Sequence, residues 1–217
     1  MKNIFEIIKN NPLFQGITFN EFERMYSCLS ARTADYKKDD IIILSGNKIN
    51  SVGLILSGGV KIIKEDINGN INIIAELAVS EIFGEVFACA GIEQSPVTVQ
   101  ASENAEILFI DYKKIITSCN SACPFHAKLI ENMIELLAQK NLMLNQKIEI
   151  LSKRTTKEKL FCFFDYQRNT KKKFTIPFNR EEMAHYLCVD RSAMSNELCK
   201  MRDEGLIKFN KNEFEII

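Results

Sequence analysis

The segment formed by residues 39–85 contains short runs rich in isoleucine, valine and leucine. The runs are separated by the turn-forming groups Ser-Gly-Asn, Ser-Gly-Gly, Asn-Gly-Asn and Phe-Gly-Glu, and a further run extends to about Ile110. β-Branched runs interrupted by turn residues roughly every 8–12 positions are typical of antiparallel sandwiches and barrels. This segment therefore predicts an antiparallel, jelly-roll-like β-roll, and the first 33 residues before it predict short helices.

A long helix is predicted from Pro124 to Ser152, with two heptad series along it. Isoleucine fills most positions of one series and leucine most positions of the other, and Asn141 lies within the first. Such a seam favours a parallel two-stranded coiled coil, in which the asparagine fixes register. We therefore expect a homodimer through Ile130, Ile134, Leu137, Asn141, Leu144 and Ile148.

A second heptad-spaced stripe on the same helix consists of Leu129, Leu136, Met143 and Ile150. We expect it to cover a separate surface, namely the β domain of its own chain. The alternative is that both stripes belong to a single intrachain core. The lone Asn141 within an apolar seam favours the dimer.

The C-terminal forty residues predict two helices joined by a tight turn and followed by a hairpin. The first helix covers residues 180–187, and Asp190 is the expected N-cap of the second, which ends near Gly205. The hairpin turns at residues 210–212. Two such helices and a hairpin form a winged helix-turn-helix.

The second of these helices has two distinct faces. Met194, Leu198 and Met201 form an apolar stripe, and a polar face lies opposite. In a helix-turn-helix the polar face meets base edges in the major groove of DNA. The expected DNA-binding residues on it are Arg191, Ser192, Ser195 and Asn196. Residues 152–217 contain 14 basic and 10 acidic side chains, which agrees with a polyanionic partner.

The fold class that follows is α+β. It consists of an effector-sensing β-roll domain (residues 1–123), a dimerisation helix (124–152) and a winged helix-turn-helix domain (153–217). The chain has a hydrophobic content of 46% and no apolar run of transmembrane length, so we expect a soluble protein that does not enter a membrane. Glu6 and Lys9 interrupt the apolar N-terminus, which argues against a secretory signal and for the cytoplasm.

The cysteine and histidine residues predict neither a metal site nor an enzyme. The seven cysteines are scattered, and a β-roll enzyme of the cupin type would need several histidines, whereas His126 and His185 both lie outside the β region. We therefore expect no cofactor. Cys119 and Cys123 form the closest cysteine pair, so a thiol redox switch is an alternative to buried structural thiols.

The order of these parts resembles that of the Crp–Fnr superfamily of transcription regulators over essentially the full chain. The stretch LILSGGVKI resembles the strand–glycine–strand segment of the family, and IFGE resembles the start of its effector-binding segment. The resemblance implies a homodimer on a pseudo-palindromic operator in double-stranded DNA, RNA polymerase as a further partner and a small-molecule effector. It also implies that Asn179 and Arg180 lie where DNA phosphates pass.

The chain departs from the cyclic-AMP-binding members of the family in the effector segment. Gly84 and Glu85 are present, but the later Arg-Ser-Ala of those members is replaced by Gln-Ser-Pro-Val, and residues 84–111 contain no arginine. A buried phosphate without a cationic partner is strongly disfavoured. We therefore expect an effector other than cyclic AMP near Gly84, Glu85 and Ser95. The alternative is a nucleotide held in a different phosphate cradle.

Two further departures lie in the helix-turn-helix. Asn196 stands where the family commonly has arginine, which indicates a different base preference at that step. Cys188 stands where the family usually has glycine, at a backbone cost. The cysteine cluster of the iron–sulfur members is missing, since Cys28 stands alone near the N-terminus, and the β-roll has no histidine for a haem.

Overall fold

The computed structural model describes residues 1–66, 71–117 and 124–217. The chain divides into two compact units, residues 1–137 and 138–217. The helix α5 (Pro124–Ser152) contributes its first half to unit 1 and its second half to unit 2.

Unit 1 begins with short helices, as predicted. They are α1 (Lys2–Ile8), the 3-10 helix η1 (Pro12–Phe14) and α2 (Phe19–Cys28). The Thr18 hydroxyl accepts a hydrogen bond from the Glu21 N–H, and the Glu21 carboxylate accepts one from the Thr18 N–H, which forms a capping box. This reciprocal cap fixes the start of α2.

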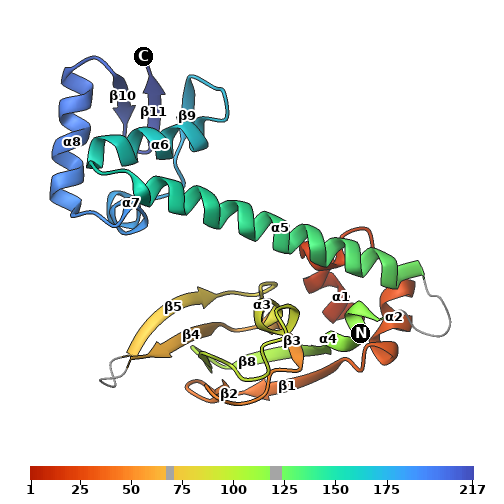
Figure 1. The fold of residues 1–217 in the computed structure, drawn as a ribbon. Helices are drawn as coiled ribbons and strands as arrows, with labels where there is room; N and C mark the ends of the chain where they lie inside the picture. The colour runs from red at the N-terminus through yellow and green to blue at the C-terminus, as the bar shows by residue number, and fades with distance from the viewer. Residues whose placement is uncertain (67–70, 118–123) are drawn as a thin grey trace. The chain divides into compact units, whose positions relative to one another are not determined.

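Two four-stranded antiparallel sheets follow and form the predicted β-roll (Figure 1). One sheet has the order β1-β8-β3-β6 and the other the order β2-β7-β4-β5. The strands are β1 (Arg32–Tyr36), β2 (Ile41–Ile43), β3 (Ser51–Ser57), β4 (Val60–Glu65), β5 (Ile71–Leu77), β6 (Ile82–Phe83), β7 (Thr98–Ala101) and β8 (Ala105–Asp111). The α+β class with an N-terminal antiparallel roll is confirmed.

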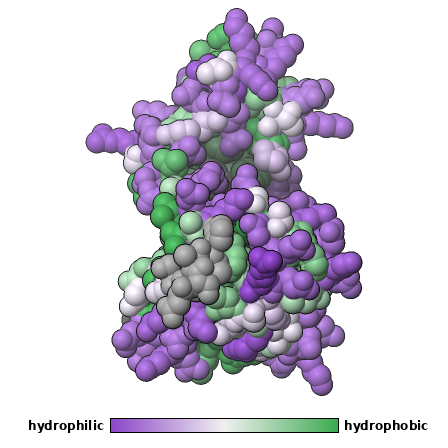
Figure 2. Space-filling model, turned by 90° about the vertical axis from the view of Figure 1, so that its right-hand side faces the viewer, coloured by the Kyte–Doolittle hydropathy of each residue, from purple (hydrophilic) through white to green (hydrophobic). Residues whose placement is uncertain are grey.

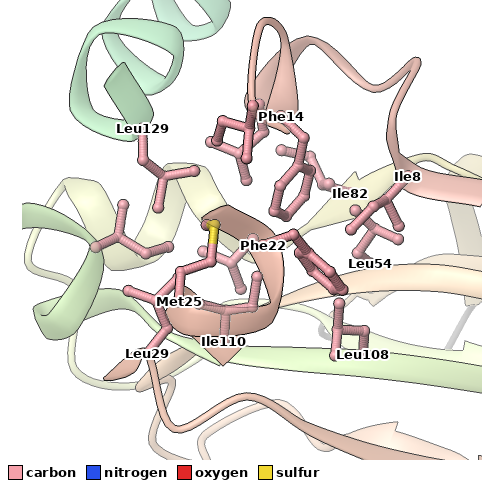
Figure 3. Close-up of a cluster of buried hydrophobic side chains, with 14 of the residues drawn as sticks. Ile8, Phe14, Phe22, Met25, Leu29, Leu54, Ile82, Leu108, Ile110 and Leu129 are labelled. Atoms are coloured by element: carbon pink, nitrogen blue, oxygen red, sulfur yellow. The ribbon is translucent and has the colours of Figure 1, made fainter. Parts of the chain in front are cut away.

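The two faces of the sheet that contains β3 and β8 belong to different cores. Ile55, Ile107 and Phe109 belong to a cluster inside the roll. Leu54 and Leu108 belong to another cluster, which also contains Phe14 and Phe22 of the N-terminal helices (Figure 3). Alternation along each strand produces this division, because successive side chains point to opposite faces.

Two short helices of unit 1 were not predicted. They are α3 (Glu85–Cys89) and α4 (Tyr112–Ile116). Gly84 precedes α3 with a φ of 81°, a conformation that glycine adopts readily. Asp111 caps α4 by accepting a hydrogen bond from the Lys113 N–H at 2.9 Å. An N-cap aspartate directly after a strand was the local signal for α4.

The helix α5 joins the cores of both units. Leu129 and Leu136 are buried against the N-terminal helices, and Ile150 is buried in the core of unit 2. Met143 is 66% exposed. Leu129 and Leu136 therefore share a core with the N-terminal helices and with strands β3 and β8, in line with the expected cover of the β domain, whereas Ile150 packs in the core of unit 2. The reason is length, because 29 helical residues extend about 43 Å, further than one small domain.

Unit 2 is a winged helix. It contains α6 (Thr156–Arg168), β9 (Lys173–Thr175), α7 (Arg180–Leu187), α8 (Arg191–Asp203), β10 (Ile207–Asn210) and β11 (Glu213–Ile216). The predicted hairpin is β10–β11, and β9 adds a third antiparallel strand beside β11. Its core includes the predicted apolar stripe of α8, since Met194, Leu198 and Met201 are at most 1% exposed.

Hydrophilic residues predominate on the face of the molecule that Figure 2 shows. None of the helices in residues 1–66, 71–117 and 124–217 has the length and apolar character that crossing a bilayer requires. Within the same ranges, no three His, Cys, Asp or Glu side chains come together as a group that could hold a metal ion.

Candidate nucleic-acid interface and effector cradle

The turn between α7 and α8 fixes where the polar face of α8 begins. Cys188 ends α7 in the left-handed conformation with a φ of 50°, as expected for a position where the family has glycine. The Asp190 carboxylate then accepts hydrogen bonds from the Ala193 N–H at 2.8 Å and the Ser192 hydroxyl at 2.5 Å. These bonds hold the pKa of Asp190 below its usual value, so the cap stays charged at neutral pH.

The predicted polar face of α8 is open to solvent. Arg191, Ser192 and Asn196 are exposed and Ser195 is half-buried, while Met194 and Leu198 on the opposite face are buried. Arg191 and Asn196 therefore extend from a helix whose other side is fixed in a core. Rigid support of this kind is what a side chain needs for reading base edges.

Asn179 and Arg180 lie at the start of α7, and each has a partner within the protein. The Asn179 side-chain oxygen accepts hydrogen bonds from the N–H groups of Glu181 and Glu182, both at 2.9 Å, so it is the N-cap of α7. Asn179 therefore stabilises the start of α7, a role that was not predicted from the sequence.

The Arg180 guanidinium lies over two aromatic rings of the hairpin. Its central carbon is 4.9 Å from the centroid of Phe209 and 5.0 Å from that of Phe214. One of its N–H groups donates a hydrogen bond to the carbonyl oxygen of Lys211 at 3.1 Å. Burial lowers the pKa of Arg180 from its ordinary value, although arginine stays protonated in proteins. Arg180 thus attaches the hairpin turn to the start of α7.

A cleft of about 810 Å³ lies between the start of α7, the start of α8 and the hairpin turn. Arg180, Arg191 and Lys211 bring three cationic groups to it, and Glu181 and Glu213 bring two carboxylates. The basic groups come from three separate elements, which the fold brings to one edge of the winged helix. A cleft of this size with cations from several elements suits a phosphate backbone.

The hairpin turn was missed as a site by the sequence analysis, which placed the expected DNA-binding residues at the starts of the two helices. Lys211 has a φ of 52° and lies at the tip of the β10–β11 hairpin. The signal that could have found it is the Asn-Lys-Asn turn, since a lysine at the tip of a wing is presented to solvent.

The three residues expected near the effector differ in their surroundings. Gly84 is the N-cap of α3, and Glu85, its first residue, is 3% exposed. Ser95 is 2% exposed, and its hydroxyl donates a hydrogen bond to the Val97 carbonyl at 2.5 Å. The Ser95 backbone pairs with the loop at Asn47. Ser95 therefore holds a turn together.

Two residues set aside as metal ligands in the sequence analysis lie together in unit 1. The Cys28 sulfur is 3.9 Å from Nε2 of His126, and burial lowers the pKa of His126, which favours the neutral imidazole. His126 is 3% exposed, and its ring lies tilted against that of Phe125 at the start of α5, with 4.6 Å between the centroids. Cys28 packs against the hydrophobic core of unit 1, and His126 is buried beside it. Cys119 and Cys123 lie outside the described residues.

Two family models match the chain. Residues 33–121 match the cyclic nucleotide-binding domain, and residues 158–217 match the Crp-like helix-turn-helix domain. The chain belongs to the Crp–Fnr superfamily of transcription regulators. The two matches coincide with the β-roll and the winged helix, so both halves of a Crp–Fnr regulator are present in the order expected from the sequence.

The Crp–Fnr regulator is similar to several known proteins. It is 21% identical over 188 residues to the transcriptional activator protein FnrA of Stutzerimonas stutzeri, covering 83% of this chain and 75% of FnrA. Its fold is similar to that of the catabolite activator protein of Thermus thermophilus, with a TM-score of 0.56, 20% identity and coverage of 95% and 93% of the two chains. The structure of DNR from Pseudomonas aeruginosa matches with a TM-score of 0.53, 15% identity and coverage of 98% and 92%.

Proposed function

We propose that this Crp–Fnr regulator is a homodimer that binds a pseudo-palindromic DNA operator through α8 and responds to a small-molecule effector at its β-roll. The observation that carries the DNA-binding proposal is the exposed polar face of α8 beside the cleft that contains Arg180, Arg191 and Lys211. In this arrangement Arg191, Ser192, Ser195 and Asn196 read base edges. Asn179, Arg180 and Lys211 lie beside the phosphates, which carry no sequence information directly.

The dimer is supported by the apolar residues that α5 leaves uncovered. Ile134 and Leu144 are each 62% exposed and Ile148 is 64% exposed, and Asn141 is exposed between them. Three large apolar side chains at heptad spacing on one helix form the stripe that a second copy covers in a parallel coiled coil. Ile130 and Leu137 are half-buried within unit 1 and lie at the N-terminal end of the same stripe.

A titration on two DNAs tests the DNA-binding proposal. The operator is first selected from random duplexes, and a scrambled duplex of the same length is the control. Asn196→Ala is expected to weaken binding to the operator by about 1–3 kcal/mol and to relax the preference at one base step. Arg180→Ala is expected to weaken binding to both DNAs alike. It is also expected to reduce the salt slope, which is the slope of log affinity against log salt concentration, by the amount that corresponds to about one phosphate contact.

The reason for this difference is that base contacts discriminate between sequences and phosphate contacts do not. An equal effect of Asn196→Ala on both DNAs, or no effect on either, contradicts the assignment of α8. A loss on the operator alone for Arg180→Ala contradicts the placement of Arg180 beside the phosphates.

The effector of this regulator is proposed to be a molecule other than cyclic AMP. No arginine lies between Gly84 and Asp111, and the Ser95 hydroxyl is bonded within its own turn. Calorimetry with cyclic AMP is expected to give no binding in the low micromolar range. Binding in that range that is lost in Glu85→Ala would show that the cradle holds the nucleotide by other means.

A specific observation favours one alternative, a nucleotide held in a different phosphate cradle. An opening of about 390 Å³ lies beside the end of α3, and Lys48, Lys113 and Tyr112 line it together with one carboxylate, that of Glu93. Two ammonium groups near α3 could take the place of the missing arginine. Loss of nucleotide binding in Lys48→Met and Lys113→Met, with binding retained in Glu85→Ala, would favour this cradle.

The RNA polymerase contact and the redox alternative remain proposals from the sequence. The polymerase contact follows from the resemblance to the family, and the similar protein FnrA is named as a transcriptional activator. For the redox alternative, Cys119→Ser and Cys123→Ser are expected to abolish any effect of oxidant on operator binding if the pair is the switch.

A further inference from the structure

Lys147 connects the long helix to the helix-turn-helix within unit 2. Its ammonium nitrogen lies 3.4 Å from the centroid of the Tyr186 ring. The same group donates a hydrogen bond to the carbonyl oxygen of Tyr186. Lys147 belongs to α5 and Tyr186 to α7, so the contact joins two elements that are far apart in the sequence.

This contact lies at the end of α7, directly before the turn. The last carbonyl groups of a helix have no partner inside the helix, and its C-terminal end attracts cations. Lys147 reaches the carbonyl of Tyr186, and Lys159 of α6 reaches that of Leu187 at 3.3 Å. Two ammonium groups therefore stabilise the end of α7, and the next residue is Cys188 in the left-handed conformation.

Both partners of the contact are fixed by packing. The Tyr186 ring lies 5.3 Å, between centroids, from each of the rings of Phe163 and Phe178. Ile150, one turn after Lys147, is 1% exposed in the same core. Burial lowers the pKa of Lys147 from its ordinary value, as expected for an ammonium group that is partly removed from water. A displacement of α5 at Lys147 therefore moves Tyr186 and the end of α7, because both partners are held by their neighbours.

We propose that Lys147 is a positioning residue through which α5 sets the orientation of the recognition helix α8. The inference rests on the proposed function, since it concerns the DNA-binding helix of that proposal. The chain also connects α5 to α6 through residues 153–155, but that connection reaches α8 only after α6, β9 and α7. The Lys147–Tyr186 contact reaches the turn before α8 directly.

The test is operator binding by the full-length protein with Lys147→Met, Lys147→Arg and Lys157→Met. Methionine keeps an unbranched apolar side chain close in length to that of lysine and removes the charge, whereas arginine keeps a cation that can lie over a ring. Lys157 is the matched control, because it lies in the same unit and is paired with Glu204 at the surface. The affinity for the selected operator is measured at two salt concentrations, well below the unfolding midpoint of each variant.

Lys147→Met is expected to lower operator affinity about tenfold with an unchanged salt slope. Lys147→Arg is expected to recover most of the affinity, and Lys157→Met to change it less than twofold. Amide hydrogen exchange at residues 186–190 is expected to become faster in Lys147→Met and to stay unchanged in the control. This local readout separates positioning from a general loss of stability.

The opposite results overturn the inference. Wild-type affinity in Lys147→Met, or a loss that the control shares, would mean that the contact does not position α8. A salt slope that falls by about one contact would mean that Lys147 touches a phosphate instead. If the wild-type protein prefers no DNA sequence, the proposed function itself fails, and that outcome is distinct from all of these.

Discussion

At the level of single residues, polar side chains of unit 2 accept hydrogen bonds from backbone N–H groups that have no partner at the starts of helices. Asp190, Asn179 and Thr155 each cap a helix of unit 2. The same caps fix the directions of α7 and α8, so that the polar face of α8 and the cleft lie at one edge of the winged helix. Local hydrogen bonds thereby decide where the candidate DNA-binding side chains lie.

Cys188 supplies a test of backbone cost at this scale. Its φ of 50° is a left-handed conformation, which costs an L-residue about 1–2 kcal/mol, while glycine adopts it readily. Cys188→Gly is therefore expected to raise the free energy of unfolding by about 0.5–1 kcal/mol. This gain is smaller than the backbone cost that is removed, because glycine loses more chain entropy on folding. Urea unfolding measures this change in the free energy of unfolding. Cys188→Ala is the control, and no gain in stability is expected for it. A destabilised glycine variant would show that the thiol, which lies 3.7 Å from the His185 carbonyl, matters more than the backbone.

At the scale of elements, α5 meets α6 through a tyrosine and a carboxylate. The Tyr166 hydroxyl donates a hydrogen bond to Glu149, which raises the pKa of Tyr166 to about 12 and holds the pKa of Glu149 below its usual value. Tyr166 binds its proton more tightly in the folded state than in the unfolded chain. Its contribution to stability is therefore fully present below about pH 10 and is lost as the pH rises towards 12.

This dependence can be measured against Tyr166→Phe. The difference in unfolding free energy between the two proteins is expected to be constant from about pH 6, where Glu149 is fully ionised, to about pH 10, and to shrink between pH 10 and 12. In Glu149→Gln the absorbance titration of Tyr166 is expected to move back towards 10, the ordinary value. A Tyr166 titration that stays near 12 without the carboxylate would mean that burial, the smaller cause, sets the pKa.

The exposed stripe of α5 gives a prediction on assembly. Asn141→Leu removes the polar residue between Ile134 and Ile148. We therefore expect the register of the two helices, or the number of chains in the oligomer, to become less well defined, without unfolding of the chain. Light scattering of both proteins at micromolar concentration measures this, and Lys153→Met, outside the stripe, serves as the control. A wild-type monomer at that concentration would refute the dimer.

At the scale of the whole molecule, a twofold dimer places geometric limits on the operator. The two recognition helices of such a dimer meet successive major grooves, so the half-sites are expected about 10 base pairs apart, or one helical turn, from centre to centre. Operators with half a turn inserted between the half-sites are expected to bind far more weakly, because the second helix then faces the wrong side of the duplex. Selection from random duplexes followed by titration of spacing variants measures this. Equal affinity at every spacing would contradict binding by a twofold dimer.

Those parts of the protein that follow from local pattern could be predicted from its amino-acid sequence. The turn-separated β-branched runs predicted the roll, and the apolar spacing of Met194, Leu198 and Met201 predicted which face of α8 is buried. Both rest on periodicity, which the backbone geometry of strands and helices imposes on any core. The effector, operator and dimer residues remain predictions, because nothing in one chain tests them.

How distant segments meet depends on the packing of the folded chain, which local pattern does not predict. The stacking of Arg180 on Phe209 and Phe214, the cleft shared with Lys211 and the contact of Lys147 with Tyr186 each join residues at least 29 positions apart. From the sequence, Arg180 was expected to contact only DNA phosphates, and neither Lys147 nor Lys211 was among the expected site residues. A cation on an exposed helix and one that caps a neighbouring helix look the same in a sequence, because only packing decides which partners lie within a few ångströms.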